Sequence, residues 1–344
     1  MKNSGRNTAH QRKIYLTVLI IIIILAAVFV GVYYLWKQTK TESEMKVSGQ
    51  AERSQTQNDA DTIEYQGSTY KYNDHLSNYL FMGIDTRENV DTYESQKDAG
   101  QADSIFLVSM DRATEQLKVL FIPRDSMTKI EVFNPSGKSL GMTTDHINIQ
   151  YAYGDGKQKS CELMKTAVSN MLDGVPIQGY CSMNMDGIAA LTDFVGGVEI
   201  TVPDSSLEDV NPDFKEGSTV TLTGENAEQF VHYRDTKKSQ SALVRQERQK
   251  TYIQALLKKC QDEASQNAGF VADLITACSS IKDYTVTSMG NDVFAKLLVA
   301  SQNGISDTQT VPGQGTEGEN FDEYHIDEDA LTEMIISMFY EKND

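Results

Sequence analysis

The sequence predicts an α/β domain, in which helices cover a sheet, behind a single N-terminal transmembrane helix. Three observations predict this class. A long stretch near the N-terminus carries no charged residue, short apolar runs of strand type recur later in the chain, and segments with apolar residues at helical spacing lie between those runs. Strands that mix with helices of this size are typical of a sheet layer covered by helices.

The first element is the stretch Ile14–Trp36, 23 residues without a charge. About 20 helical residues cross the apolar core of a bilayer. A cleaved signal peptide and a buried core helix are the alternatives, but the run is long for a signal sequence and no A-x-A cleavage site follows it. Four bases and no acid precede it: Lys2, Arg6, Arg12 and Lys13. Because positive charge stays inside, we expect a single-pass type II protein of the cell membrane with residues 1–13 in the cytoplasm.

The composition of the segment after the anchor predicts a stalk. Residues 37–62 are polar and charged and have almost no large apolar side chain, so they cannot bury a core. We therefore expect a flexible stalk over residues 37–69, a catalytic domain over 70–262, and a C-terminal helical extension over 263–344 that packs on the core.

Three apolar runs predict neighbouring strands at the start of the domain. They are Tyr79–Ile84, Ser104–Met110 and Leu117–Ile122, and the segment DRATEQ between the last two is typical of a hairpin. The sequences GYCSMN (Gly179–Asn184) and VEITV (Val198–Val202) are further strand candidates.

Helical spacing of apolar residues predicts the covering helices. The segments are 155–172, Asp186–Val195, Gly224–Arg234 and Arg245–Cys260. About three more helices and a loop rich in Gly and acids, Val311–Glu323, follow, and the last helix is expected over Asp327–Glu341.

Composition excludes several functions for this chain. It has 344 residues, 31 Lys+Arg against 49 Asp+Glu, and a net charge of −18, so it lacks the basic footprint of a nucleic-acid binder. The four cysteines have no CxxC spacing, which excludes a zinc ribbon or a thioredoxin motif. No GxSxG, HExxH or Walker A motif is present.

The first candidate site is a pair of carboxylates at strand ends. Asp85 follows the run Tyr79–Ile84, and Asp103 precedes the run Ser104–Met110. If these strands pair antiparallel, both carboxylates lie at one edge of the sheet. One or two carboxylates together with substrate phosphates are the usual protein ligands of Mg²⁺. The alternative is that both are ordinary turn residues.

The second candidate site is a set of arginines. Arg124 leaves a strand in the sequence IPRD, and charged residues at such strand ends often face the ligand crevice. The helix Arg245–Cys260 places five residues on one face: Arg245, Arg248, Gln249, Tyr252 and Leu256. With Arg87 and Arg234, these arginines predict a site for phosphate oxygens, which the planar guanidinium suits. Surface ion pairs are the alternative.

At these residues the chain resembles the LytR-CpsA-Psr (LCP) family. The motifs that carry the resemblance, in order, are GIDTRE (Gly83–Glu88), ADS (Ala102–Ser104), FIPRDS (Phe121–Ser126), INIQYAYGDG (Ile147–Gly156), VGGVEITVP (Val195–Pro203), LTGENAEQFVHYR (Leu222–Arg234) and RQERQ (Arg245–Gln249). They cover roughly residues 76–260, behind the single anchor.

The resemblance implies a mixed central sheet flanked by helices and a phosphotransferase outside the membrane. Such an enzyme attaches an anionic glycopolymer, a teichoic acid or a capsular polysaccharide, from an undecaprenyl-pyrophosphate carrier to a peptidoglycan acceptor, and a hydrophobic cleft holds the polyprenyl lipid. Asp85 and Asp103 match its Mg²⁺ ligands, and Asp125 is a candidate general base beside the catalytic Arg124. Residues that match its pyrophosphate site are Arg87, Arg124, Arg234, Arg245, Arg248 and Gln249.

This sequence departs from the family pattern where Gln101–Ala102, His232 and Ala242 stand. These differences concern substrate identity first and turnover second. The alternative function is that of a non-catalytic protein that binds a lipid pyrophosphate or a wall polymer on the same fold.

Overall fold

The computed structural model describes residues 62–87, 89–93, 99–134, 136–267 and 269–343. The expected cytoplasmic tail, the expected membrane span 14–36 and most of the expected stalk lie outside these residues. No helix in the described part of the chain is both long and apolar enough to cross a bilayer.

The described residues are organised around a six-stranded mixed sheet with the strand order β11-β8-β3-β4-β5-β12. Its bounds are β3 Leu76–Ile84, β4 Ala102–Asp111, β5 Leu117–Ile122, β8 Gly179–Asn184, β11 Thr285–Thr287 and β12 Ile305–Thr310. The central strands β3, β4 and β5 are antiparallel neighbours, as the three apolar runs predicted. Strands β8 and β12 run parallel to β3 and β5, so the sheet is mixed.

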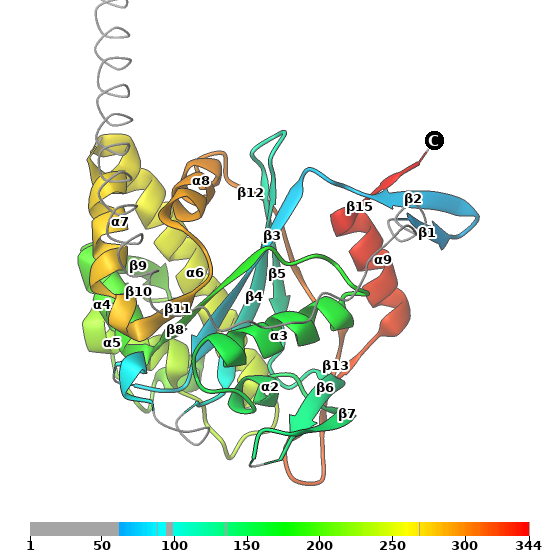
Figure 1. Ribbon diagram of the computed structural model, residues 1–344. Helices are drawn as coiled ribbons and strands as arrows, with labels where there is room; N and C mark the ends of the chain where they lie inside the picture. Colours follow the sequence, from blue (N-terminus) through cyan, green and yellow to red (C-terminus); the bar gives the residue numbers. More distant parts are fainter. Residues whose placement is uncertain (1–61, 88, 94–98, 135, 268, 344) are drawn as a thin grey trace, which may run out of the picture. The chain divides into compact units, whose positions relative to one another are not determined.

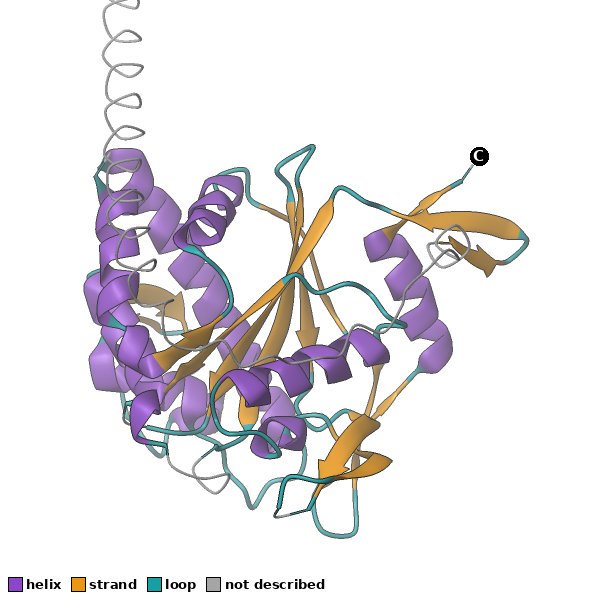
Figure 2. Cartoon of the chain, viewed as in Figure 1, coloured by secondary structure: helices purple, strands orange, loops and turns teal. Residues whose placement is uncertain are grey.

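Helices cover both faces of this sheet, which confirms the predicted mixed sheet flanked by helices (Figures 1 and 2). The helices are α2 Ile149–Ala152, α3 Gln158–Met171, α4 Met185–Phe194, α5 Gly224–His232, α6 Ser241–Gln266, α7 Phe270–Ser280, α8 Asn291–Ser301 and α9 Glu328–Phe339. Short 3₁₀ turns lie at Val90–Thr92, Ser205–Leu207 and Lys282–Tyr284.

Successive side chains of a central strand point to opposite faces of the sheet, which explains why an apolar core lies on each face. On β3, Leu80, Met82 and Ile84 are buried in the main core with α3 and α9. The intervening side chains Tyr79 and Phe81 point to the opposite face and pack with residues of α8. Successive residues of a strand face opposite sides, so one apolar strand supplies two layers.

Smaller sheets complete the domain. Strands β9 Val198–Thr201 and β10 Thr219–Leu222 pair beside α5 and α6, and their apolar residues form a second core. The hairpins β6 Met127–Phe133 with β7 Ser139–His146, and β13 Gly313–Glu317 with β14 Asp322–Ile326, lie near the end of β5.

The structure differs from the sequence prediction at both ends of the domain. Strands β1 Thr62–Tyr65 and β2 Ser68–Tyr72 form a three-stranded sheet with β15 Tyr340–Lys342, so the ordered chain begins before Tyr70. These strands have few apolar side chains, and the composition of the segment therefore predicted a stalk where the structure has a small sheet. The residues after 262 are not a purely helical extension, because β11 and β12 form the two edges of the central sheet.

Candidate active site

The two predicted acidic residues lie at the same end of two central strands, where β3 ends and β4 begins. Strands β3 and β4 pair with Ile84 opposite Ala102, after an irregularity in the register. This brings Asp85 beside Gln101, whose backbone N–H donates a hydrogen bond of 2.6 Å to the Asp85 Oδ1. Partial burial and the nearby charge of Asp103 raise the pKa of Asp85, against that hydrogen bond and the Arg124 charge.

Asp103 is the buried centre of the site, with 6% of its surface exposed. The Arg245 Nη1 donates to its Oδ2 at 2.6 Å, and the Arg124 Nη1 donates to its Oδ1. Burial alone would raise the pKa of Asp103, but the two guanidinium charges outweigh burial and hold the pKa below its ordinary value. The two arginines therefore favour the ionised form of Asp103.

Arg124 links Asp103 to the loop that follows β5. It follows β5, and its Nε donates to the Asp125 Oδ1 at 2.9 Å. Its Nη2 donates to the Gln101 Oε1 at 3.2 Å. Burial opposes the charge of this guanidinium, but the carboxylates of Asp103 and Asp125 raise the pKa of Arg124 above its usual value. The prediction that Arg124 leaves its strand toward a crevice agrees with this placement.

Arg245 reaches the site from the first turns of α6 and is almost fully buried. Its Nε and Nη2 have no hydrogen-bond partner among the described residues. Burial lowers the pKa of Arg245, against the attraction of Asp103. A buried donor without a partner is costly, so these two groups mark a place where an anionic ligand would bring compensation.

Arg248 and Gln249 share the buried face of α6 but contact the end of α5. The Arg248 Nε donates to the Phe230 carbonyl at 2.9 Å, and its Nη2 donates to the Tyr233 carbonyl. The Gln249 Nε2 donates to the Val231 carbonyl at 3.1 Å. The Arg248 side chain is 1% exposed. The structure therefore places Arg248 where it supports α5, instead of in the crevice where the sequence pattern predicted it.

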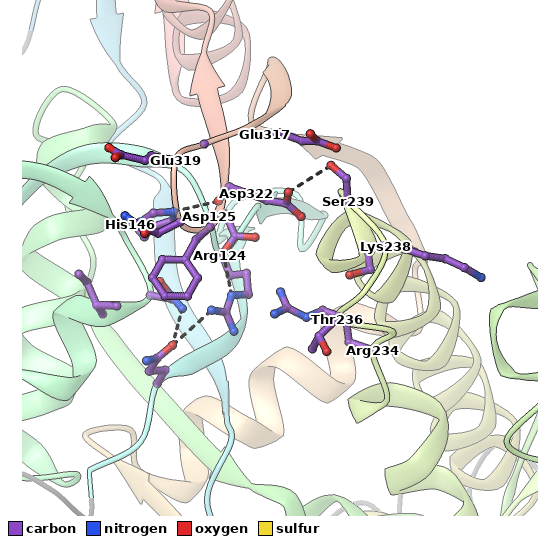
Figure 3. A pocket seen from close by; sticks show the side chains of 17 residues that line it. Arg124, Asp125, His146, Arg234, Thr236, Lys238, Ser239, Glu317, Glu319 and Asp322 are labelled. Carbon is purple, nitrogen blue, oxygen red and sulfur yellow. Dashed lines mark hydrogen bonds and ion pairs between the residues drawn. The ribbon is translucent and has the colours of Figure 1, made fainter.

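The remaining two arginines lie on either side of the buried centre. Arg87 is exposed and pairs with Asp186 at 3.4 Å and with Glu228. These two acids raise the pKa of Arg87, against partial burial. Arg234 follows α5 and lines a polar pocket together with Arg124 and Asp125. Figure 3 shows Arg234 across the pocket from Arg124.

An apolar cavity of about 330 Å³ lies between the central sheet and helices α4, α6 and α8. Its lining includes Phe81, Phe106, Leu256 and Leu298, and its polar lining residues include Asp103 and Gln249. The apolar stripe that continues from the arginines along α6 thus lines a cavity that ends at the charged centre.

The polar pocket that Arg234 and Arg124 line has a volume of about 370 Å³ (Figure 3). Arg124, Asp125 and Gln101 line it, and so do residues that the sequence analysis did not select: His146, Asn148, Phe321 and Asp322. The segment Val311–Glu323 was predicted as a loop, whereas residues 313–326 form the β13–β14 hairpin with its turn. Nothing in the spacing of that segment indicated that it returns to the end of β5.

Asp85 and Asp103 provide part of the donor set that Mg²⁺ requires. Among the described residues, no group of three His, Cys, Asp or Glu side chains could hold a metal ion. Asp85 and Asp103 supply hard oxygen donors. Burial and the charge of Asp103 raise the pKa of Asp85, and a cation would relieve the repulsion between the two carboxylates. Since Mg²⁺ usually takes one or two carboxylates and completes its shell with water and substrate phosphates, these residues fit such an ion.

The fold and the site define an α/β protein with an arginine–carboxylate centre between an apolar cavity and a polar pocket. The chain belongs to the LytR_cpsA_psr family, whose model matches residues 32–339.

Curated relatives in this family carry the name polyisoprenyl-teichoic acid–peptidoglycan teichoic acid transferase. TagU of Halalkalibacterium halodurans is 32% identical over 57% of this chain and 57% of that protein. TagU of Bacillus mycoides is 28% identical over 74% of this chain and 75% of that protein. TagV of Bacillus subtilis is 31% identical over 52% of this chain and 42% of that protein, so this chain matches about half the length of some relatives.

Solved structures share the fold. The crystal structure of B. subtilis TagV has a TM-score of 0.58 at 23% identity, over 77% of this chain and 97% of that chain. The structure of TagT bound to LI-WTA has a TM-score of 0.56 at 20% identity, over 77% and 89% of the two chains.

Proposed function

We propose that this chain is a glycopolymer transferase that takes its cargo from an undecaprenyl-pyrophosphate carrier and attaches it to peptidoglycan. The names of its relatives support the substrate class. An expected membrane anchor at residues 14–36 keeps the catalytic domain close to the lipid carrier on the outer side of the cell membrane.

One observation carries this proposal: three chemically different environments follow one another. The apolar cavity reaches Asp103, which is paired with Arg124, and Arg124 lines the polar pocket. A polyprenyl pyrophosphate that bears a sugar has the same order of an apolar chain, an anionic group and a polar group. The buried donors of Arg245 without partners lie in the middle, where the pyrophosphate would be.

The residues then supply positioning and charge for a phosphoryl transfer. An acceptor hydroxyl oxygen attacks the phosphorus that bears the glycopolymer, and the bond from that phosphorus to the bridging oxygen breaks. The polyprenyl phosphate leaves with the electron pair, and the hydroxyl proton passes to Asp125. Arg124 and Arg245 stabilise the negative charge on the phosphate oxygens as it redistributes.

Mg²⁺ would be held by Asp85 and Asp103, and when bound it would neutralise charge on the pyrophosphate. Asp103 also positions both guanidinium groups, because each of its oxygens accepts a hydrogen bond from one of them. Asp85→Asn should impair only the binding of Mg²⁺, whereas Asp103→Asn should also disturb the positions of the two guanidinium groups.

The test uses the full chain in detergent with a polyprenyl-pyrophosphate-linked glycopolymer and a peptidoglycan acceptor. Release of polyprenyl phosphate and formation of a phosphodiester to peptidoglycan are measured. Arg124→Gln should reduce turnover by at least about 10-fold, because a hydrogen bond to a charged group contributes roughly 1.5–3 kcal/mol. Lys258→Gln, in an exposed ion pair on α6, is the matched control and should retain turnover. Binding of the lipid without any turnover would instead identify a non-catalytic binding protein.

Metal removal gives a separate prediction. EDTA should abolish turnover and added Mg²⁺ should restore it. Mg²⁺ should also raise the melting temperature of the wild-type protein, because a ligand that binds only the folded state stabilises it. Asp85→Asn should lose this shift. A wild-type protein that turns over fully in EDTA would contradict the metal assignment.

A further inference from the structure

The tip of the β13–β14 hairpin exposes an aromatic ring at the polar pocket. Phe321 is 74% exposed and lines that pocket. A single exposed apolar residue needs no explanation by itself. This one is different because the surrounding residues hold its segment in place beside the charged centre.

The β14 side of the hairpin tip is attached to elements that carry the site. The His146 Nε2 lies 2.9 Å from the Asp322 carbonyl oxygen, and the His146 ring meets the Phe321 ring edge to face at 6.4 Å. The Tyr324 N–H donates to the Asp125 carbonyl at 2.9 Å. The Asp322 carboxylate accepts from the Gln240 N–H at 2.6 Å, just before α6. The position of Phe321 is thus coupled to Asp125 and to the start of the helix that carries Arg245.

The pocket is unsuited to a second polyanionic group. Three cationic side chains line it, against four carboxylates: Arg124, Arg234 and Lys238, against Asp125, Glu317, Glu319 and Asp322. Amides and hydroxyls complete the lining, among them Gln101, Asn148, Thr236 and Ser239. Its volume of about 370 Å³ is within the range of small-molecule sites, roughly 300–1,000 Å³.

We infer that Phe321 is a specificity-determining residue of this pocket: its exposed ring is the platform for the apolar C–H face of an uncharged pyranose ring bound next to the pyrophosphate. A pyranose has an apolar face and a rim of hydroxyls, which matches one exposed aromatic ring beside many polar groups. This inference rests on the proposed function, since the pyrophosphate at Arg124 and Arg245 places the sugar. The ring belongs either to the first sugar of the donor or to the peptidoglycan acceptor.

The experiment compares two probes on the full chain in detergent. Farnesyl pyrophosphate tests the lipid and pyrophosphate sites alone, and a farnesyl pyrophosphate that carries N-acetylglucosamine adds the sugar. Phe321→Ala should weaken binding of the sugar-bearing probe roughly 2- to 10-fold, the range for an aromatic contact, and leave farnesyl pyrophosphate affinity unchanged. Phe321→Tyr, which keeps the ring, should bind both probes as the wild type does.

A second measurement distinguishes whether the sugar belongs to the donor or to the acceptor. If the ring belongs to the acceptor, Phe321→Ala leaves both probe affinities unchanged and raises the KM for a soluble peptidoglycan fragment. Leu140→Ala, an exposed apolar residue on β7, is the control and should change none of these values. No change in either arm with Phe321→Ala overturns the sugar site. Failure of the wild type to bind farnesyl pyrophosphate overturns the proposed function itself.

Discussion

Arg124, which follows β5, and Arg248 on α6 illustrate how contacts, and not residue type, decide the role of an arginine. Arg124 is 18% exposed in its side chain and contacts the carboxylates of Asp103 and Asp125. Arg248 is 1% exposed and contacts the carbonyls of Phe230 and Tyr233. We predict opposite consequences for the same conservative change.

Arg248→Lys should lower the free energy of unfolding by about 1–3 kcal/mol for each buried carbonyl left without a donor. Folded Arg248→Lys protein should bind farnesyl pyrophosphate nearly as well as the wild type. Arg124→Lys should behave inversely, with a small change in stability and roughly 10-fold or more weaker binding, because a point charge lacks the guanidinium fork. Urea denaturation and calorimetry measure the two quantities. Equal binding losses in both variants would show that Arg248 acts at the pyrophosphate after all.

The sequence predicted which residues face inward on α6 but not what each one meets. The spacing correctly placed Arg245, Arg248 and Gln249 on one buried face. Helical periodicity carries no information on the partner that covers this face. Arg248 meets the end of α5 and Arg245 meets β4, and that difference depends on how α5 packs on α6.

His146 gives the clearest pH prediction at this scale. Burial would lower its pKa, but the hydrogen bond to Asp145, the Asp322 carbonyl and the charge of Asp125 outweigh burial and raise the pKa. Its stabilising contribution is therefore fully present below the unfolded-state pKa, about 6.5, and is lost as the pH rises through the folded-state pKa.

The difference in the free energy of unfolding between wild type and His146→Gln should consequently be larger at pH 5.5 than at pH 8.5. Denaturation at a series of pH values measures it. Asp145→Asn, which removes the negative charge of the carboxylate 2.9 Å from the His146 Nδ1, should reduce the pH dependence that His146 contributes. A difference that is constant with pH would show that His146 acts only through packing.

At the scale of elements, the β13–β14 hairpin supports the start of α6. The Asp322 carboxylate accepts from the Ser239 hydroxyl at 3.1 Å and from the Gln240 N–H, and the Gln240 Nε2 donates to the Thr316 carbonyl at 2.9 Å. Gln240 has a φ of 58°, a left-handed conformation that costs a non-glycine residue energy and needs support from its surroundings.

Asp322→Ala should therefore lower the free energy of unfolding by about 1–3 kcal/mol and increase hydrogen exchange in the first turn of α6. Exchange over residues 241–245, followed by mass spectrometry, measures the local effect. Glu319→Ala, in the exposed turn of the same hairpin, is the matched control and should leave exchange in α6 unchanged. Equal protection of α6 from hydrogen exchange in wild type and Asp322→Ala would show that the hairpin does not support the start of α6.

Within the central sheet, the four inner strands were predictable from the sequence and the two edge strands were not. The apolar runs at Tyr79–Ile84, Ser104–Met110 and Leu117–Ile122 fall within β3, β4 and β5, and GYCSMN matches β8. The missed edge strands β11 and β12 read TVT and ISDTQT, which are short or polar. An edge strand has one neighbour and needs fewer apolar side chains, so the periodicity signal is weak.

On the scale of the whole molecule, the last 80 or so residues complete the fold that the earlier residues begin. Strand β12 pairs in parallel with β5, the strand that precedes Arg124. Helix α9 places five buried side chains in the main core: Leu331, Met334, Ile335, Met338 and Phe339. The boundary expected after residue 262 also falls inside α6, which extends to Gln266.

A chain that ends at Asp262 should therefore fail to fold. Burying an apolar side chain of this size contributes about 1.5–3 kcal/mol, so the five residues of α9 together contribute an amount comparable to a typical domain stability of about 5–15 kcal/mol. Loss of β11 and β12 would also expose both edges of the sheet formed by β3, β4, β5 and β8. A chain that ends at Phe339 is the control, because it removes only β15 and the final residues, and it should melt cooperatively at a lower temperature. Circular dichroism at increasing temperature distinguishes the two, and a cooperative transition in the chain that ends at Asp262 would establish the C-terminal residues as a dispensable extension.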